Sequence, residues 1–104
     1  MISDEIIIDA VSRLREAAPG ATIILFGSHA RGEAREGSDL DFMVVEPEVK
    51  ARREEMVRLR RAVGRIGMPV DIIVVSRKNF EEWRNVPGSA IYRVAKDGIV
   101  LNSP

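Results

Sequence analysis

Cysteine is absent from this chain of 104 residues, and histidine, tryptophan and tyrosine occur once each. Without cysteine there can be no disulfide and no thiolate metal site, which fits a reducing compartment. An excess of either charge is also missing, because 16 lysines and arginines balance 16 aspartates and glutamates. Bulk charge therefore indicates neither a nucleic-acid-binding protein nor a membrane-surface protein.

Long hydrophobic runs are missing as well. No stretch approaches the length of a membrane span, and the first residues, MISDEIIIDAV, lack the basic start and long apolar run of a signal peptide. Hydrophobic residues still make up 45% of the chain, which is typical of a globular protein and too high for disorder. We expect a soluble, cytoplasmic protein with a single domain over residues 1–104.

The hydrophobic spacing predicts alternating helices and strands. Helices are expected over residues 3–18, 48–66, 76–85 and 87–98, and strands over residues 21–26, 38–46, 69–76 and 99–101. A short polar turn or helix should follow the first strand, at about residues 28–33. Ser3 and Ser76 are placed to cap helices. Trp83 and Tyr92 are expected to pack in the core, with an interface role for Tyr92 as the alternative.

These elements follow the order αβ(α)βαβααβ and predict an α+β fold, in which helices pack on a small mixed sheet of three to four strands. The 15 residues from Gly27 to Asp41 are too few for a standard parallel crossover. We therefore expect the first two strands to be antiparallel neighbours.

Two carboxylates, Asp39 and Asp41, stand at the start of the second expected strand, within the stretch GSHARGEAREGSDLDFMVV. On a strand, residues two apart point to the same face, and their Cα atoms lie roughly 7 Å apart. Neighbouring carboxylates repel one another and resist burial unless a positive charge joins them. A hard divalent cation such as Mg²⁺ prefers oxygen ligands and completes its shell with water and phosphates. We expect this pair to bind such a cation.

The residues before this pair suit a phosphate chain. Gly27 and Ser28 directly follow a buried strand, where backbone N–H groups and a hydroxyl can approach phosphate oxygens. Arg31 and Arg35 could neutralise phosphate charge, and simple solvation of the turn is the alternative for both. Metal, serine and arginine together predict a site for a nucleoside triphosphate.

Asp71 is the only charge inside the apolar third strand, PVDIIVV. If this strand lies beside the second, Asp71 joins Asp39 and Asp41. Three carboxylates could hold two metal ions about 3.5–4 Å apart, one on the triphosphate and one at an incoming oxygen. Asp71 could also act as general base toward that oxygen.

The pair Gly27-Ser28, ten intervening residues and Asp39-x-Asp41 together resemble the signature of the nucleotidyltransferase superfamily that includes DNA polymerase beta. The length, the ARG after Gly-Ser, SDLD and VDIIVVS look most like its smallest members. These are the minimal nucleotidyltransferase (MNT-domain) proteins, often encoded as antitoxins beside HEPN-domain ribonucleases. The likeness extends over nearly the whole chain, including the leading helix and the closing AKDGIVL.

This resemblance implies an adenylyltransferase that uses two Mg²⁺ ions and moves AMP from ATP to an acceptor hydroxyl, with a HEPN-domain protein as partner. It assigns the nucleotide to Gly27, Ser28, Arg31 and Ser38, and catalysis and metal binding to Asp39, Asp41 and Asp71. Two departures bear on the acceptor or partner rather than on the carboxylates. His29 stands where a small or aromatic residue is expected, and no tyrosine follows the last strand.

Three other interpretations of the motif compete with this one. A solvated strand entry would also place Asp39 and Asp41 at a turn. A P-loop would need lysine and serine or threonine where Glu33 and Ala34 stand. An EF-hand loop that begins at Asp39 would need a glycine where Val44 stands. These mismatches exclude the P-loop and the EF-hand.

Two functions remain as alternatives to a nucleotidyltransferase that modifies a protein. One is an antitoxin that neutralises its partner by contact alone, and the other is a small-molecule nucleotidyltransferase of the aminoglycoside-modifying kind. The latter would need a second domain or a dimer partner, whereas a chain of this length leaves the acceptor to be brought by another macromolecule. The arginine-rich residues 50–65 are expected to form a solvated face, with a surface for RNA or an acidic partner as the alternative. His29 is expected to be structural or to face a partner.

Overall fold

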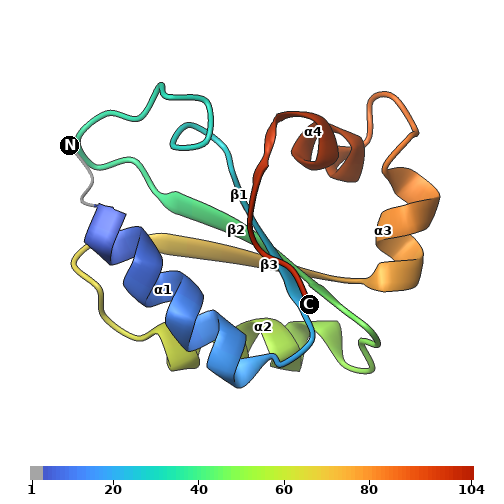
Figure 1. Ribbon diagram of the computed structural model, residues 1–104, viewed down its shortest axis with the longest axis horizontal. Helices are drawn as coiled ribbons and strands as arrows, with labels where there is room; N and C mark the ends of the chain where they lie inside the picture. The colour runs from blue at the N-terminus through green and yellow to red at the C-terminus, as the bar shows by residue number, and fades with distance from the viewer. Residues whose placement is uncertain (1–3) are drawn as a thin grey trace.

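The computed structural model describes residues 4–104 (Figure 1). Its helices and strands are α1 (Asp4–Ala17), β1 (Thr22–Phe26), β2 (Leu40–Glu46), α2 (Arg52–Val63), β3 (Val70–Ser76), α3 (Arg77–Trp83), α4 (Ala90–Asp97) and β4 (Ile99–Asn102). Ser3, the expected cap of the first helix, lies outside the described residues. Among the described helices, none is both long and apolar enough to cross a membrane.

The four strands form one mixed sheet in the order β3-β2-β1-β4. β1 pairs antiparallel with β2 and β4, and β2 pairs in parallel with β3. The α+β class and the antiparallel first pair are thereby confirmed. α1 and α2 cover one face of the sheet, and α3 and α4 cover the other (Figure 1). The parallel pair is feasible because α2 supplies the crossover between its strands.

Both faces of β2 are buried, so this strand is apolar at consecutive positions rather than at alternate ones. Phe42 and Val44 are fully buried on the side of α1 and α2. Met43 and Val45 belong to a second core, with Phe80 of α3 on the opposite face. Because β2 is clamped between two cores, the position of its first residues is fixed from both sides.

Serine hydroxyls start the last two helices. Ser76 Oγ accepts a hydrogen bond from the Asn79 N–H at 3.1 Å, as expected from the sequence. Ser89 Oγ accepts one from the Tyr92 N–H at 3.0 Å. Each bond satisfies a backbone donor that the first turn of the helix leaves unpaired.

The second helix and the second strand are shorter than expected. The helix is α2, Arg52–Val63, rather than residues 48–66, and Gly64 ends it with a φ of 65° that favours glycine. The second strand starts at Leu40, whose N–H donates to the Pro69 carbonyl at 2.9 Å, so Asp39 precedes β2 instead of lying in it.

Trp83 is not a core residue, contrary to expectation, and Tyr92 is only half-buried. α3 is seven residues long, and Phe80 takes its buried position. Trp83, its last residue, is 48% exposed and lies on the rim of a cavity shared with Met43 and Ile73. A helix of this length buries side chains along only one turn, where Phe80 lies, and Trp83 is at the C-terminal end of the helix.

Candidate functional site

Asp41 and Asp71 are direct neighbours in the sheet. The parallel register of β2 and β3 pairs these two residues, and the antiparallel register of β1 and β2 pairs Asp41 with Phe26 at the end of β1. Paired residues of neighbouring strands point to the same face. Asp39 lies just ahead of β2, two residues before Asp41. The fold therefore gathers the three carboxylates expected from the sequence at one end of the sheet.

The charges around Asp41 oppose its ionisation. Burial raises the pKa of the Asp41 carboxyl, and the negative charges of Asp71 and Asp39 raise it further. His29 and Arg31 act on this pKa in the opposite direction, but more weakly. Ionisation of Asp41 therefore costs more free energy in the protein than in water, and a cation beside it would lower that cost.

Gly27, the residue after β1, brings the backbone closest to this carboxylate. It has a φ of 78°, which residues with a side chain rarely adopt. A Cβ atom at this position would collide with Oδ2 of Asp41. Only glycine therefore lets the turn after β1 pass so near the carboxylate.

Backbone hydrogen bonds hold the turn that follows Gly27. The Arg31 N–H donates to the Gly27 carbonyl at 3.2 Å, and the Glu33 N–H donates to the Ser28 carbonyl at 2.8 Å. The Ser28 hydroxyl has no hydrogen-bond partner within residues 4–104. Arg31 forms an exposed ion pair with Glu33 at 2.8 Å, which leaves its guanidinium near the turn. The turn thus offers a free hydroxyl and a cationic side chain.

Ser38 and His29 tie this turn to the segment that carries Asp39. Ser38 Oγ accepts a hydrogen bond from the Arg35 N–H at 2.9 Å, which closes the loop before β2. The Ser38 carbonyl accepts one from Nε2–H of the half-buried His29 at 3.3 Å. His29 therefore has the structural role that was one of its two expected roles. Its partner could not be foreseen, because it is a backbone carbonyl nine residues away.

Arg60 of α2 is a site residue that the sequence did not single out. Its guanidinium forms an ion pair with Oδ1 of Asp71 at 3.4 Å, and both side chains are more than half exposed. The Arg60 side chain can extend past the edge of the sheet to Asp71, because β3 is an edge strand. Several arginines share this helix, so the sequence held no signal that would separate Arg60 from the others.

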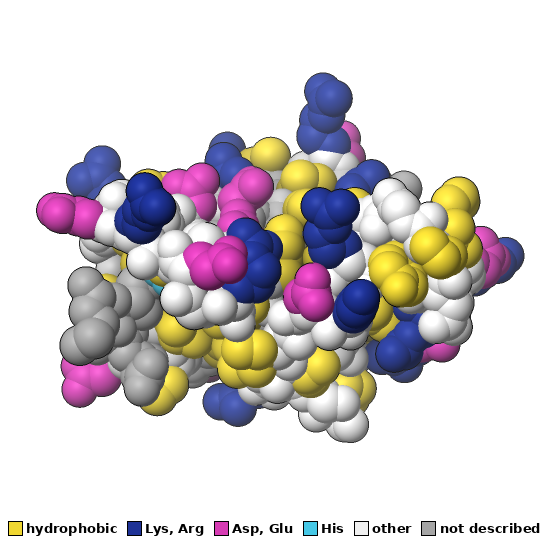
Figure 2. Space-filling model, turned by 90° about the horizontal axis from the view of Figure 1, so that it is seen from above, with side chains coloured by type: hydrophobic (Ala, Val, Ile, Leu, Met, Phe, Trp, Pro, Cys, Tyr) yellow, Lys and Arg dark blue, Asp and Glu magenta, His cyan; other side chains and the backbone are white. Residues whose placement is uncertain are grey.

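A cavity of about 300 Å³ lies beside the turn. The strand ends contribute Phe26, Gly27 and Arg31, the floor is formed by Met43 and Ile73, and the opposite wall comes from Gly88, Ser89, Ala90, Arg93, Val94 and Asp97. Figure 2 looks onto this side of the molecule, where basic and acidic side chains are interspersed. The cavity is large enough to receive a small ligand next to the carboxylates.

The donor set suits a hard cation. Carboxylate oxygens are the ligands that Mg²⁺ prefers, and burial together with the charges of Asp71 and Asp39 raises the pKa of Asp41. Asp39, Asp41 and Asp71 are the residues that would hold the ion. Within residues 4–104 no three acidic, imidazole or thiol groups already surround one point, and Asp71 is engaged by Arg60. A metal ion held by all three carboxylates would therefore require side-chain movement, and it would compete with Arg60 for Asp71.

A model of the nucleotidyltransferase domain matches residues 5–100. The chain belongs to this family. A solved minimal nucleotidyltransferase is 30% identical, with 95% of each chain covered and a TM-score of 0.64. A nucleotidyltransferase-like protein of Sulfolobus solfataricus shares the fold at 20% identity, with 92% of this chain and 76% of that chain covered and a TM-score of 0.64.

A toxin–antitoxin structure with AMP-PNP also shares the nucleotidyltransferase fold. It is 23% identical, covers 99% of this chain and 75% of that chain, and has a TM-score of 0.62. No curated protein matches the sequence. The expected nucleotidyltransferase fold and family are confirmed, whereas the roles of individual site residues stay predictions.

Proposed function

We propose that this nucleotidyltransferase-domain protein transfers AMP from ATP, with Mg²⁺, to a hydroxyl group of a partner protein. We further propose that it is the antitoxin of a cytoplasmic pair whose toxin carries a HEPN domain. The observation that carries the proposal is the adjacency of Asp41 and Asp71 beside the Gly27-Ser28 turn. The fold shared with a toxin–antitoxin structure that contains AMP-PNP supports both the nucleotide and the pairing.

In this proposal the turn after β1 binds the phosphate chain of ATP. Gly27 brings the backbone close, and the free hydroxyl of Ser28 donates to a phosphate oxygen. Arg31 neutralises phosphate charge, for which it must leave Glu33. The Ser38 hydroxyl accepts but does not donate a hydrogen bond within the described residues, so its proton is available to the nucleotide.

The carboxylates hold the metal and move the proton. Bound Mg²⁺ supplies charge neutralisation on the triphosphate and the acceptor oxygen. Asp39 and Asp41 would hold the cation at the start of β2. Asp71 takes the proton of the acceptor hydroxyl while the oxygen forms its bond to the α-phosphorus. The bond from that phosphorus to the bridging oxygen breaks, and pyrophosphate leaves.

The test is incubation of the chain with ATP labelled at the α-phosphate, Mg²⁺ and the separately purified HEPN-domain partner. We expect label on the partner, none with label on the γ-phosphate, and none with Asp41→Asn. The matched control is Glu36→Gln, an exposed carboxylate of the neighbouring loop. A tight complex without label would overturn transfer and favour an antitoxin that acts by contact. Label on a small hydroxyl compound alone would favour the small-molecule enzyme.

A further inference from the structure

α2 carries a stripe of two parallel rows, each of the form arginine–apolar–arginine at a spacing of four residues. The rows are Arg52, Met56, Arg60 and Arg53, Val57, Arg61. Residues four apart lie above one another on a helix, so the two rows form one continuous face. These six residues alone line a hollow of about 650 Å³. The arginine stripe therefore has basic ends and an apolar centre, with no acidic residue in its lining.

The positive charge of the stripe is largely unbalanced. Arg53 and Arg61 pair with no carboxylate within residues 4–104. By contrast Arg58, on the other side of the same helix, makes two hydrogen bonds of 2.7 Å to Glu55. The net charge of the chain is zero, but the charges on α2 are unevenly distributed: Arg58 is neutralised on one side, and Arg53 and Arg61, unpaired within the described residues, lie on the other.

The arginine stripe follows the outer edge of the sheet. Nε of Arg52 donates to the Val74 carbonyl of β3 at 2.9 Å. Near the other end of the stripe, Arg60 pairs with Asp71 at 3.4 Å. Since β3 is an edge strand, the stripe runs beside it and reaches Asp71 near its start.

We propose that the arginine stripe docks an acidic helix of the partner protein that presents the acceptor hydroxyl. The arginine pairs at its two ends lie about 12 Å apart along the helix axis. A partner helix with carboxylates two turns apart and apolar side chains between them matches this pattern of charge.

A protein fits the centre of the stripe better than a nucleic acid does. Val57 is 45% exposed there, and Met56 lies beside it in the hollow. Methionine and arginine are enriched at protein interfaces. Binding of single-stranded nucleic acid commonly adds aromatic side chains on which bases stack, and the stripe has none.

Docking at the stripe also explains how an acceptor would reach Asp71. This point and the identity of the partner rest on the proposed transfer reaction, whereas binding of an acidic helix at the stripe does not. A partner carboxylate at Arg60 competes with Asp71 for the same guanidinium. Binding of the partner would therefore release Asp71 for its part in the reaction at the moment when the acceptor arrives.

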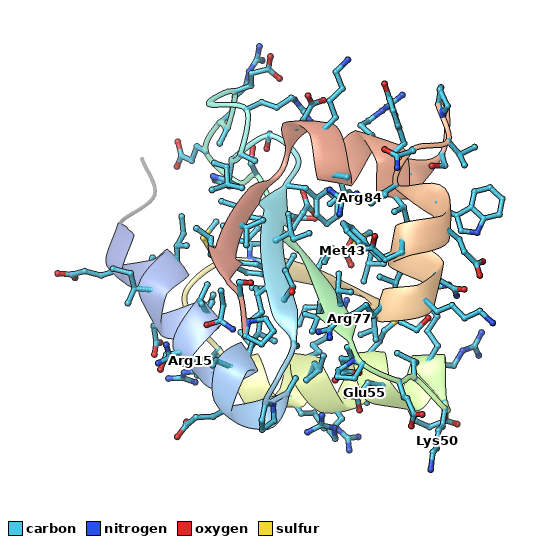
Figure 3. All side chains as sticks on the ribbon, turned by 45° about the vertical axis from the view of Figure 1, so that its right-hand side comes forward. Arg15, Met43, Lys50, Glu55, Arg77 and Arg84 are labelled. Carbon is cyan, nitrogen blue, oxygen red and sulfur yellow. The ribbon has the colours of Figure 1, made fainter. Side chains whose placement is uncertain are left out.

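The surface can be tested with a fluorescent helical peptide that carries two pairs of glutamates two turns apart and leucines between them. Its binding to the full chain is followed by fluorescence anisotropy at low and physiological ionic strength. The test variant combines Arg53→Glu and Arg61→Glu, two side chains outside the nucleotide site. The matched control combines Arg15→Glu on α1 (Figure 3) with Lys78→Glu on α3, which changes the net charge equally.

We expect the test variant to bind the peptide at least about tenfold more weakly, and the control to differ by less than about twofold. A second variant, Arg53→Gln with Arg61→Gln, removes the two charges without reversing them and so guards against a disturbance of α2. It should also bind the peptide more weakly than the unaltered chain. Equal loss in test and control variants, no binding by the unaltered chain, or a preference for an oligouridylate over the peptide would overturn the docking surface. Stabilisation of the unaltered chain by MgATP is measured in parallel, and its absence would count against the proposed function alone.

Discussion

Asp41 and Asp71 lie at the same level of two parallel neighbouring strands, with strand axes about 4.8 Å apart. Such a pair of like charges is unfavourable in an otherwise apolar sheet. β2 is buried on both faces beyond Asp41, whereas Asp71 lies exposed near the start of the edge strand β3. The repulsion is therefore located at one end of the sheet, where the proposed cation would relieve it.

Replacing Asp41 by asparagine should separate activity from stability. Asp41→Asn should lower nucleotidyl transfer by at least about a hundredfold, because a ligand of the metal is lost. It should also raise the melting temperature without metal, since burial and the charges of Asp71 and Asp39 oppose ionisation of Asp41. Calorimetry without Mg²⁺ and the labelled-ATP assay measure the two effects. A lower melting temperature, with transfer intact, would contradict both.

A methyl group at Gly27 should stop transfer by steric collision. Gly27→Ala would place Cβ against the Asp41 carboxylate, so we expect at least about a hundredfold loss of activity. Gly37→Ala is the matched control, because Gly37 has a similarly positive φ of 86° but no atom of residues 4–104 outside its chain neighbours within 4 Å of an added Cβ. That control should lose only about 1 kcal/mol of stability and keep its activity. Equal loss of activity in the two variants would point to backbone strain instead of the collision.

The sequence predicted that Asp41 and Asp71 meet only if the second and third strands are neighbours, and the parallel pairing of β2 and β3 supplies that condition. Strand periodicity and the short segment after Gly27 were enough to place β1 beside β2, and a lone charge in an apolar strand marked Asp71. The Arg60 ion pair depends on where α2 crosses the sheet, and the His29 hydrogen bond depends on how a loop closes. Patterns of neighbouring residues in a sequence do not determine contacts that depend on how distant segments pack.

Arg60 should compete with the metal for Asp71. In Arg60→Gln this positive charge is gone, so half-maximal stabilisation of the chain by ATP should need a few-fold less Mg²⁺. The free energy of unfolding without metal should change by less than about 0.5 kcal/mol, because the pair is exposed. Arg58→Gln, which breaks a pair with Glu55 on another side of α2, is the control. An unchanged or higher Mg²⁺ requirement in Arg60→Gln would refute the competition.

A carboxyl pair at the opposite end of the sheet should make stability depend on pH. Burial, followed by a hydrogen bond to Glu55, raises the pKa of Glu46 from 4.5 to about 7. Hydrogen bonds from Arg58 and Glu46 lower the pKa of Glu55 to about 2. Figure 3 shows Glu55 on α2, away from the turn after β1.

The two shifts have opposite signs. The raised pKa of Glu46 stabilises the folded chain fully below pH 4.5, and this stabilisation is lost as the pH rises through 7. The lowered pKa of Glu55 stabilises the folded chain fully above pH 4.5, and this stabilisation is lost as the pH falls toward 2. Urea unfolding across this range should therefore show lower stability at both ends. Glu46→Gln should flatten the decrease between pH 5 and 8, and Glu48→Gln, a neighbouring exposed carboxylate, should keep it. A decrease that persists in Glu46→Gln would assign it to another group.

The parallel pairing of β2 and β3 has a consequence for the newly made chain. Asp39 and Asp41 emerge from the ribosome before α2, but Asp71 follows only after the whole crossover. The strand that flanks β1 on its other side, β4, comes last of all. A chain that is still being synthesised, or that has lost its last strand to a protease, therefore lacks part of the framework around the carboxylates. The proposed nucleotidyl transfer should therefore begin only after β3 and β4 have both joined the sheet.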